Sequence, residues 1–147
     1  MAPTRLPHGE VTASEGLDDW RVVLRALRGA FTAPSFAAGG ALVAEIAAEA
    51  DRRDHHPDVA MGYPGTVRVT LTTHSAGGIT ELDIDFARAI SALARDAGAA
   101  PDPSAGQTVE LAIDTMDADA IRPFWEAALG YQAQSDGSLV DPRGLGP

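Results

Sequence analysis

The chain has 147 residues, of which 45% are hydrophobic and none is cysteine, so it fits a globular protein without disulfides, thiolate catalysis or cysteine-ligated zinc. Its 21 acidic residues outnumber its 11 basic residues, all of them arginine, and the net charge of −10 argues against a nucleic-acid partner. It contains neither an apolar run of membrane-spanning length nor a signal-peptide pattern, so we expect a cytoplasmic protein without a membrane partner.

The first half of the chain predicts strands followed by a helix. Residues 1–17 are polar and rich in proline and glycine, and we expect them to be flexible. In residues 18–33, Val22, Leu24 and Ala26 alternate as in a strand, but the pattern also fits a helix. We favour one or two strands because Gly29 interrupts the run and Phe31-Thr32 suits a pleated surface. Residues 35–53 predict a helix capped by Ser35 and ended by Pro57. Its expected buried face is Phe36, Gly39, Gly40, Val43, Ile46, Ala47 and Ala50.

The next segments predict a strand, a helix and a linker. Residues 66–73 alternate strictly, with Val67, Val69 and Leu71 toward the core, as in an antiparallel sheet with one covered face. By the same alternation, His74 would share the polar side of this strand, which is either the face away from the apolar core or a pocket at the strand's end. Residues 80–97 predict a helix with a capping box, Thr80 to Asp83. Its expected buried stripe is Leu82, Phe86, Ile90 (or Ala89) and Leu93, and residues 99–107 read as a linker.

Three of the four histidines, His55, His56 and His74, lie near several carboxylates in this pattern. Imidazole is the side chain best suited to proton transfer near neutral pH, so an acid–base site is one interpretation. Another is that the adjacent pair caps the preceding helix, where a cation interacts favourably with the helix dipole. A third is a metal site made of the three histidines and a carboxylate.

The order of these residues resembles the pterin-4a-carbinolamine dehydratase family. The matching positions are Asp51, His55, His56, Pro57, Tyr63, Thr73, His74 and Asp83, and the resemblance covers about residues 18–97. Two features depart from the family pattern. Asp51 stands where the family commonly has glutamate, and the chain is one residue longer between Tyr63 and His74, which a turn at Pro64-Gly65 would absorb.

The resemblance implies an α+β domain over residues 18–98, with helices packed on one face of a four-stranded antiparallel sheet. It also implies a homodimer or homotetramer, a pterin substrate, and no metal or organic cofactor. The implied reaction is dehydration of 4a-hydroxytetrahydropterin to quinonoid dihydropterin, as in tetrahydrobiopterin recycling. His55 and His74 would transfer protons, His56 would orient the pterin or share this work, and Asp51 and Asp83 would hold the imidazoles.

Residues 108–147 predict a separate β-α-β segment, with strands at VELAID and GSLVD around a helix at DADAIRPFWEAALG. This segment resembles the beginning of a glyoxalase-like module of the vicinal-oxygen-chelate type, in which Glu110 would fall at a metal-ligand position. Two other functions therefore stay open. One is a non-catalytic oligomeric binding module on the same scaffold, and the other is metal-dependent glyoxalase-like activity.

Overall fold

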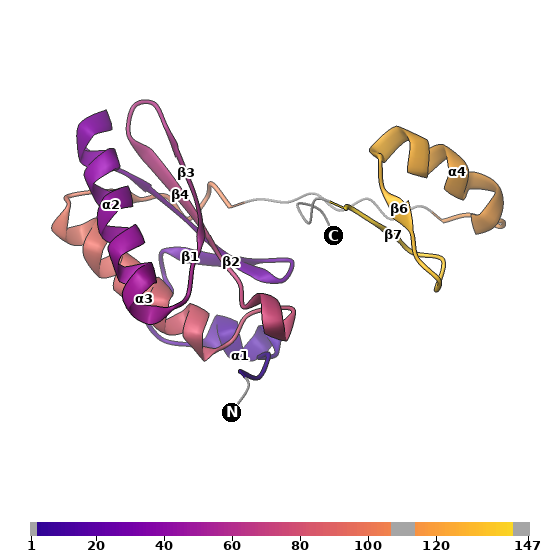
Figure 1. Cartoon of the computed structure of the whole chain (residues 1–147), viewed down its shortest axis with the longest axis horizontal. Helices are drawn as coiled ribbons and strands as arrows, with labels where there is room; N and C mark the ends of the chain where they lie inside the picture. The colour runs from indigo at the N-terminus through magenta and orange to yellow at the C-terminus, as the bar shows by residue number, and fades with distance from the viewer. Residues whose placement is uncertain (1–2, 107–113, 143–147) are drawn as a thin grey trace. The chain divides into compact units, whose positions relative to one another are not determined.

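The computed structural model describes residues 3–106 and 114–142. The chain divides into two compact units, residues 1–108 and 109–147, and each is treated by itself (Figure 1). The first unit holds the core and the predicted histidine site. None of the helices in the described ranges is long and apolar enough to cross a membrane.

The first unit is built on an antiparallel sheet with strand order β1-β2-β4-β3. The strands are β1 (Trp20–Val23), β2 (Ala26–Thr32), β3 (Asp58–Gly62) and β4 (Thr66–Leu71). The expected strands in residues 18–33 are therefore present. A fifth strand, β5 (Ala100–Pro101), pairs with β2 at Thr32 and Phe31. The count of four was thus one strand short, and the first part of the expected linker belongs to the sheet.

Strand β4 shows the alternation that its sequence predicts. Val67, Val69 and Leu71 are buried, and Leu71 pairs with Leu27 of β2. Arg68 and Thr70 point to the opposite face. The apolar face is covered by the helices, while the polar face carries the loop that follows β5.

Helix α2 (Phe36–Arg53) begins where predicted, with the Ser35 hydroxyl accepting a hydrogen bond from the Ala38 amide. Its buried residues are Gly39, Leu42, Ile46 and Ala50. The expected face was wrong in part, because Phe36 is 52% exposed and Leu42 is buried instead. Phe36 occupies the first helical turn, and the packed face starts one turn later.

Helix α3 (Glu81–Asp96) begins with the predicted capping box, formed by Thr80 and Asp83. The residues that it buries are Asp83, Ile84, Phe86, Ala87, Ile90, Ser91 and Ala94. Leu82, expected in the buried stripe, is 48% exposed, because Asp83 and Ile84 face inward at the first turn. Ser91 accepts a hydrogen bond from the indole Nε1 of Trp20, which ties the helix to β1. Helices α2 and α3 lie on the same face of the sheet (Figure 1).

The N-terminal segment is more ordered than its composition predicts. Residues His8–Ala13 form the short helix α1, and its Val11 is completely buried in the core. The Leu6 amide also donates to the Ile79 carbonyl. The expectation of a flexible stretch over residues 1–17 was therefore wrong for residues 6–13.

In the second unit, α4 (Ala118–Leu129) is followed by a hairpin of β6 (Gln132–Ala133) and β7 (Leu139–Val140). The predicted helix is present, and β7 falls within the predicted second strand. The expected strand at residues 108–113 and Glu110 lie outside the described residues. The resemblance to a glyoxalase-like module stays a prediction.

Candidate active site

His55 and Asp83 form a close pair between the end of α2 and the start of α3. The imidazole Nε2 of His55 lies 2.7 Å from Oδ1 of Asp83. The Asp83 side chain is fully buried and that of His55 is 12% exposed. The His55 ring also packs against Phe86 of α3, with ring centroids 6.2 Å apart. The imidazole is thus held by Asp83 and packed against Phe86, and only a small part of it is exposed to solvent.

The second oxygen of Asp83 is held by two threonines. Oδ2 accepts hydrogen bonds from the Thr73 hydroxyl and from the Thr80 amide, each at 2.7 Å. The two threonine hydroxyls lie 2.8 Å apart, and the Leu82 amide donates to the Thr80 hydroxyl. These donors fix the carboxylate, so Asp83 both caps α3 with Oδ2 and presents Oδ1 to His55.

The local sequence explains how His55 reaches this carboxylate. Asp54 ends α2 in the left-handed conformation, with φ of 50°, and reverses the chain. The His55 amide then donates to the carbonyl of Ala50. Pro57 comes two residues later and prevents any continuation of the helix before β3 begins at Asp58. Pro57 therefore acts on the backbone here.

His56 points to a different carboxylate. Its Nε2 lies 3.1 Å from Oδ1 of Asp51, and the two side chains are 60% and 81% exposed. The nearby cations of Arg52 and Arg53 bind Glu49 instead, and their hydrogen bonds hold the pKa of Glu49 below its usual range. Asp51 is thereby left to pair with His56. The two histidine side chains contact carboxylates, so the interpretation as cationic helix caps receives no support from their contacts.

His74 lies just beyond the end of β4 and is exposed, as expected for the side that faces away from the apolar core. Strand β4 ends at Leu71, and His74 opens a single 3-10 turn, η1 (His74–Ala76). The strand therefore ends before His74, although burial still alternates, with Thr73 buried and His74 exposed. Thr73, the preceding residue, binds Asp83 Oδ2, so His74 is one residue removed along the chain from a ligand of the carboxylate that holds His55.

Tyr63 does not join this group within one chain. It follows β3 in the hairpin loop to β4 and is 90% exposed. Asp58, at the other end of β3, is the strand residue nearest to His55 in sequence. The five residues of β3 span roughly 17 Å at the usual strand rise, which places Tyr63 at the far end of the hairpin. Gly62 pairs with Thr66, so residues 63–65 form the loop in which the predicted extra residue would fall.

Two residues of the site were not among the candidates. Thr80 was recognised only as a helix cap, and Phe86 only as a core residue. The capping-box pattern already indicates a contact between Thr80 and Asp83, but no local pattern predicts that Phe86 packs on the ring of His55. Arg53 also lies over Phe86, with its guanidinium carbon 5.3 Å from the ring centroid.

The arrangement is suited to proton transfer. A carboxylate can only accept, so Nε2 of a neutral His55 carries the hydrogen and Nδ1 presents a lone pair. This tautomer is inferred from the hydrogen-bond partner. In the described parts of the chain, no three histidine, aspartate or glutamate side chains come together as metal ligands, so the metal interpretation gains no geometric support.

Comparisons with known proteins show the family to which the chain is similar. Residues 4–93 match the family model described as pterin 4 alpha carbinolamine dehydratase. A Nocardia farcinica protein provisionally named as such an enzyme is 46% identical over 84 residues, which are 57% of this chain and 87% of that protein. A protein of the same provisional name from Brucella ovis is 39% identical over 97 residues, 64% of this chain and 99% of that one.

A solved structure also resembles this chain. The crystal structure titled transcriptional coactivator/pterin dehydratase from Brucella melitensis matches with a TM-score of 0.57 and 36% identity, covering 62% of this chain and 99% of the other. The match of the family model extends over more than half of the residues and includes every predicted site position. The chain belongs to the pterin-4a-carbinolamine dehydratase family.

Proposed function

We propose that this protein dehydrates a 4a-hydroxytetrahydropterin to the quinonoid dihydropterin and water. The observation that carries the proposal is the buried Asp83 carboxylate, which holds the imidazole of His55 at 2.7 Å and is itself fixed by Thr73 and Thr80. Family membership supplies the substrate class, and the histidines supply groups able to move protons.

The reaction requires two proton transfers, one to the leaving hydroxyl group and one from a ring nitrogen of the pterin. The hydroxyl on carbon 4a must gain a proton so that the carbon–oxygen bond breaks and water leaves. The neighbouring ring nitrogen must lose its proton so that a carbon–nitrogen double bond forms. A positioned acid or base contributes typically 10²–10⁴-fold to such steps.

His55 is the proposed base of this pair. With Nε2–H directed to Asp83, the lone pair on Nδ1 of His55 would accept the proton of the ring nitrogen. His74, which follows Thr73 at the same carboxylate, would protonate the leaving hydroxyl. The exposed pair of His56 and Asp51 would orient the pterin at the rim. Tyr63 would contribute to pterin binding only from a neighbouring copy, because it lies at the far end of its own hairpin.

The test is the decay of freshly generated 4a-hydroxytetrahydropterin, followed by its ultraviolet absorbance with and without the purified chain. We expect the chain to accelerate the decay and His55→Ala and His74→Ala to lose most of the acceleration. His56→Ala should raise KM more than it lowers kcat. The matched control is His8→Ala, which changes an exposed histidine of α1 outside the site. Wild-type rates in all three site variants would rule out the histidine mechanism.

A further inference from the structure

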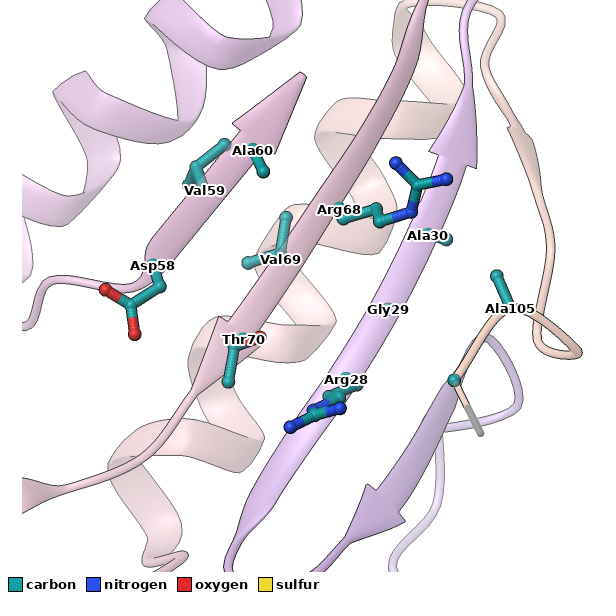
Figure 2. Close-up of a pocket in the computed structure, with 11 residues that line it drawn as sticks. Arg28, Gly29, Ala30, Asp58, Val59, Ala60, Arg68, Val69, Thr70 and Ala105 are labelled. Atoms are coloured by element: carbon teal, nitrogen blue, oxygen red, sulfur yellow. The ribbon is translucent and has the colours of Figure 1, made fainter. Parts of the chain in front are cut away.

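A hollow of about 340 Å³ lies on the sheet face opposite to α2 and α3 (Figure 2). Strands β2, β3 and β4 form its floor, and Ala105 and Gly106 border it after the chain leaves β5. Its small residues leave room above the strands, and its charged side chains are Arg28, Arg68 and Asp58. The hollow is therefore open and lined mostly by apolar groups, with these charged side chains as its polar part, and it belongs wholly to the first unit.

The register of the sheet brings the two arginines together. Arg28 pairs with Thr70, and Arg68 pairs with Ala30, so the arginines are diagonal neighbours on β2 and β4. Diagonal neighbours on one face are roughly 7–8 Å apart, within reach of such long side chains. Arg21 of β1 is directly opposite Arg28. This concentration of positive charge stands in a chain whose net charge is −10.

The two guanidinium groups are only partly compensated by carboxylates. The pKa of Asp102 is lowered, chiefly by its hydrogen bonds with Ser104 and to a lesser degree by the charge of Arg68. Nε of Arg28 is buried and has no hydrogen-bond partner within the described ranges. Ion pairs in residues 3–106 and 114–142 involve neither Arg28 nor Arg68. A buried donor left unpaired costs about 1–3 kcal/mol, and like charges directly opposite each other add a further cost. An acceptor in the hollow would remove both costs.

We propose that this hollow binds a small oxyanion, a carboxylate or phosphate group, through Arg28 and Arg68. Guanidinium groups match the planar oxygen pairs of such anions and bind them by charge-assisted hydrogen bonds. The volume is near the lower end of that typical of small-molecule sites, roughly 300–1,000 Å³. A long polyanion is disfavoured because the rest of the chain is acidic.

The hollow is separate from the histidine site. His55 packs against Phe86 on the helical side of the sheet, whereas Arg28 and Arg68 point away from the helices. Anion binding and dehydration can therefore fail independently. Loss of the dehydratase rate in His55→Ala says nothing about the hollow, and loss of anion binding in an arginine variant says nothing about the histidines.

The experiment titrates the full chain with inorganic phosphate and, separately, with malonate, at constant ionic strength kept with sodium chloride. Binding is read from the melting temperature and from the NMR resonance of the Arg28 Nε–H group. We expect a saturable rise in melting temperature and a saturable shift of that resonance. Arg28→Met and Arg68→Met should each weaken binding at least tenfold, and the control Arg95→Met, an exposed arginine of α3, should bind like the wild type.

The two probes distinguish the source of the anion. Saturation by phosphate alone supports a phosphate-bearing ligand, saturation by malonate alone supports a carboxylate, and saturation by both supports a general oxyanion site. Responses that sodium chloride reproduces would overturn the proposal. Equal responses in the wild type and in both arginine variants would overturn it as well, and far-ultraviolet circular dichroism verifies that each variant is folded.

Discussion

Nε2 of His55 lies 2.7 Å from Oδ1 of Asp83, although 28 positions separate the two residues. The contact joins the chain just beyond the C-terminus of α2 to the first turn of α3. Asp83 is completely buried, and its other oxygen is occupied by Thr73 and Thr80. The two carboxylate oxygens therefore have different roles. Oδ2 binds the threonines that hold α3 in place, and Oδ1 faces the proposed base, His55.

Replacing Asp83 with asparagine tests the side that faces His55. The amide can still cap α3 with its oxygen, but it then presents an N–H donor to Nε2 and disfavours the tautomer with the lone pair on Nδ1. We expect the dehydratase rate to fall on the order of 10²-fold. The measurement is kcat for the folded variant, with Asp85→Asn as the control, because Asp85 is an exposed residue of the same helix paired with Arg88. An unchanged kcat would mean that Asp83 serves only as a cap.

Thr73→Val tests the structural side of the same carboxylate. Valine keeps the shape and removes the hydroxyl that donates to Asp83 Oδ2 at 2.7 Å. Because this group is buried, we expect the free energy of unfolding to fall by about 1–3 kcal/mol. Urea denaturation measures the change, and Thr70→Val, on the outward face of β4, should stay within about 0.5 kcal/mol of the wild type. An equal decrease in the free energy of unfolding in both variants would show that the hydrogen bond from Thr73 to Asp83 has no special role in stability.

The neighbouring glycines of α2 should respond in opposite directions to alanine. A Cβ at Gly39 would meet the Gly65 carbonyl oxygen at 3.0 Å and Met61 Sδ at 3.2 Å, whereas a Cβ at Gly40 meets nothing within 4 Å. We expect Gly39→Ala to destabilise by about 1–3 kcal/mol through overpacking. Gly40→Ala should stabilise by about 0.5–1 kcal/mol because alanine favours the helix.

Thermal or urea unfolding of the two glycine variants decides between two roles for the pair. Each glycine can either merely weaken the helix or allow a close approach of the backbone to its neighbours. Stabilisation by both substitutions would show that the loop at Gly65 yields easily and that Gly39 is not needed for packing. Opposite signs of the change in unfolding free energy in the two variants would show that only Gly39 is needed for close packing.

Local patterns predicted the elements better than their contacts. Alternation located β4, and the capping residues Ser35 and Thr80 located the starts of α2 and α3, because these signals act within a few residues. The exposure of Leu82 was missed because it follows from the contacts of Asp83 with His55 and Thr73. These contacts orient the first turn of α3, and they join parts of the chain that are distant in sequence. Strand β5 was missed for a similar reason, because no local pattern in residues 99–107 predicts their pairing with β2.

The site was predicted as a set of residues but not as a geometry. The order of the motif residues from Asp51 to Asp83 sufficed to name the family, and the chemistry that the family implies remains a proposal. It did not reveal which carboxylate each imidazole contacts, because this depends on the reversal at Asp54 and on the end of β4 at Leu71. Tyr63 is the clearest example of a position that the motif does not predict. Its place in the motif made it a candidate site residue, but it lies at the end of the β3–β4 hairpin that is far from His55.

Removing residues 107–147 tests whether the second unit contributes to the reaction. The hydrophobic core cluster extends from Val11 to Ala99, and β5 ends at Pro101, so the shortened chain keeps every core residue of that cluster and the whole sheet. We expect the melting temperature and the dehydratase rate to stay close to those of the full chain, with kcat unchanged within about twofold, since no step assigned to His55 or His74 draws on the second unit. A folded shortened chain with a greatly reduced rate would place part of the function in residues 107–147. In that case metal content and glyoxalase-type activity of the full chain become the next measurements, because the resemblance of this segment to a metal-binding module would then bear on the reaction.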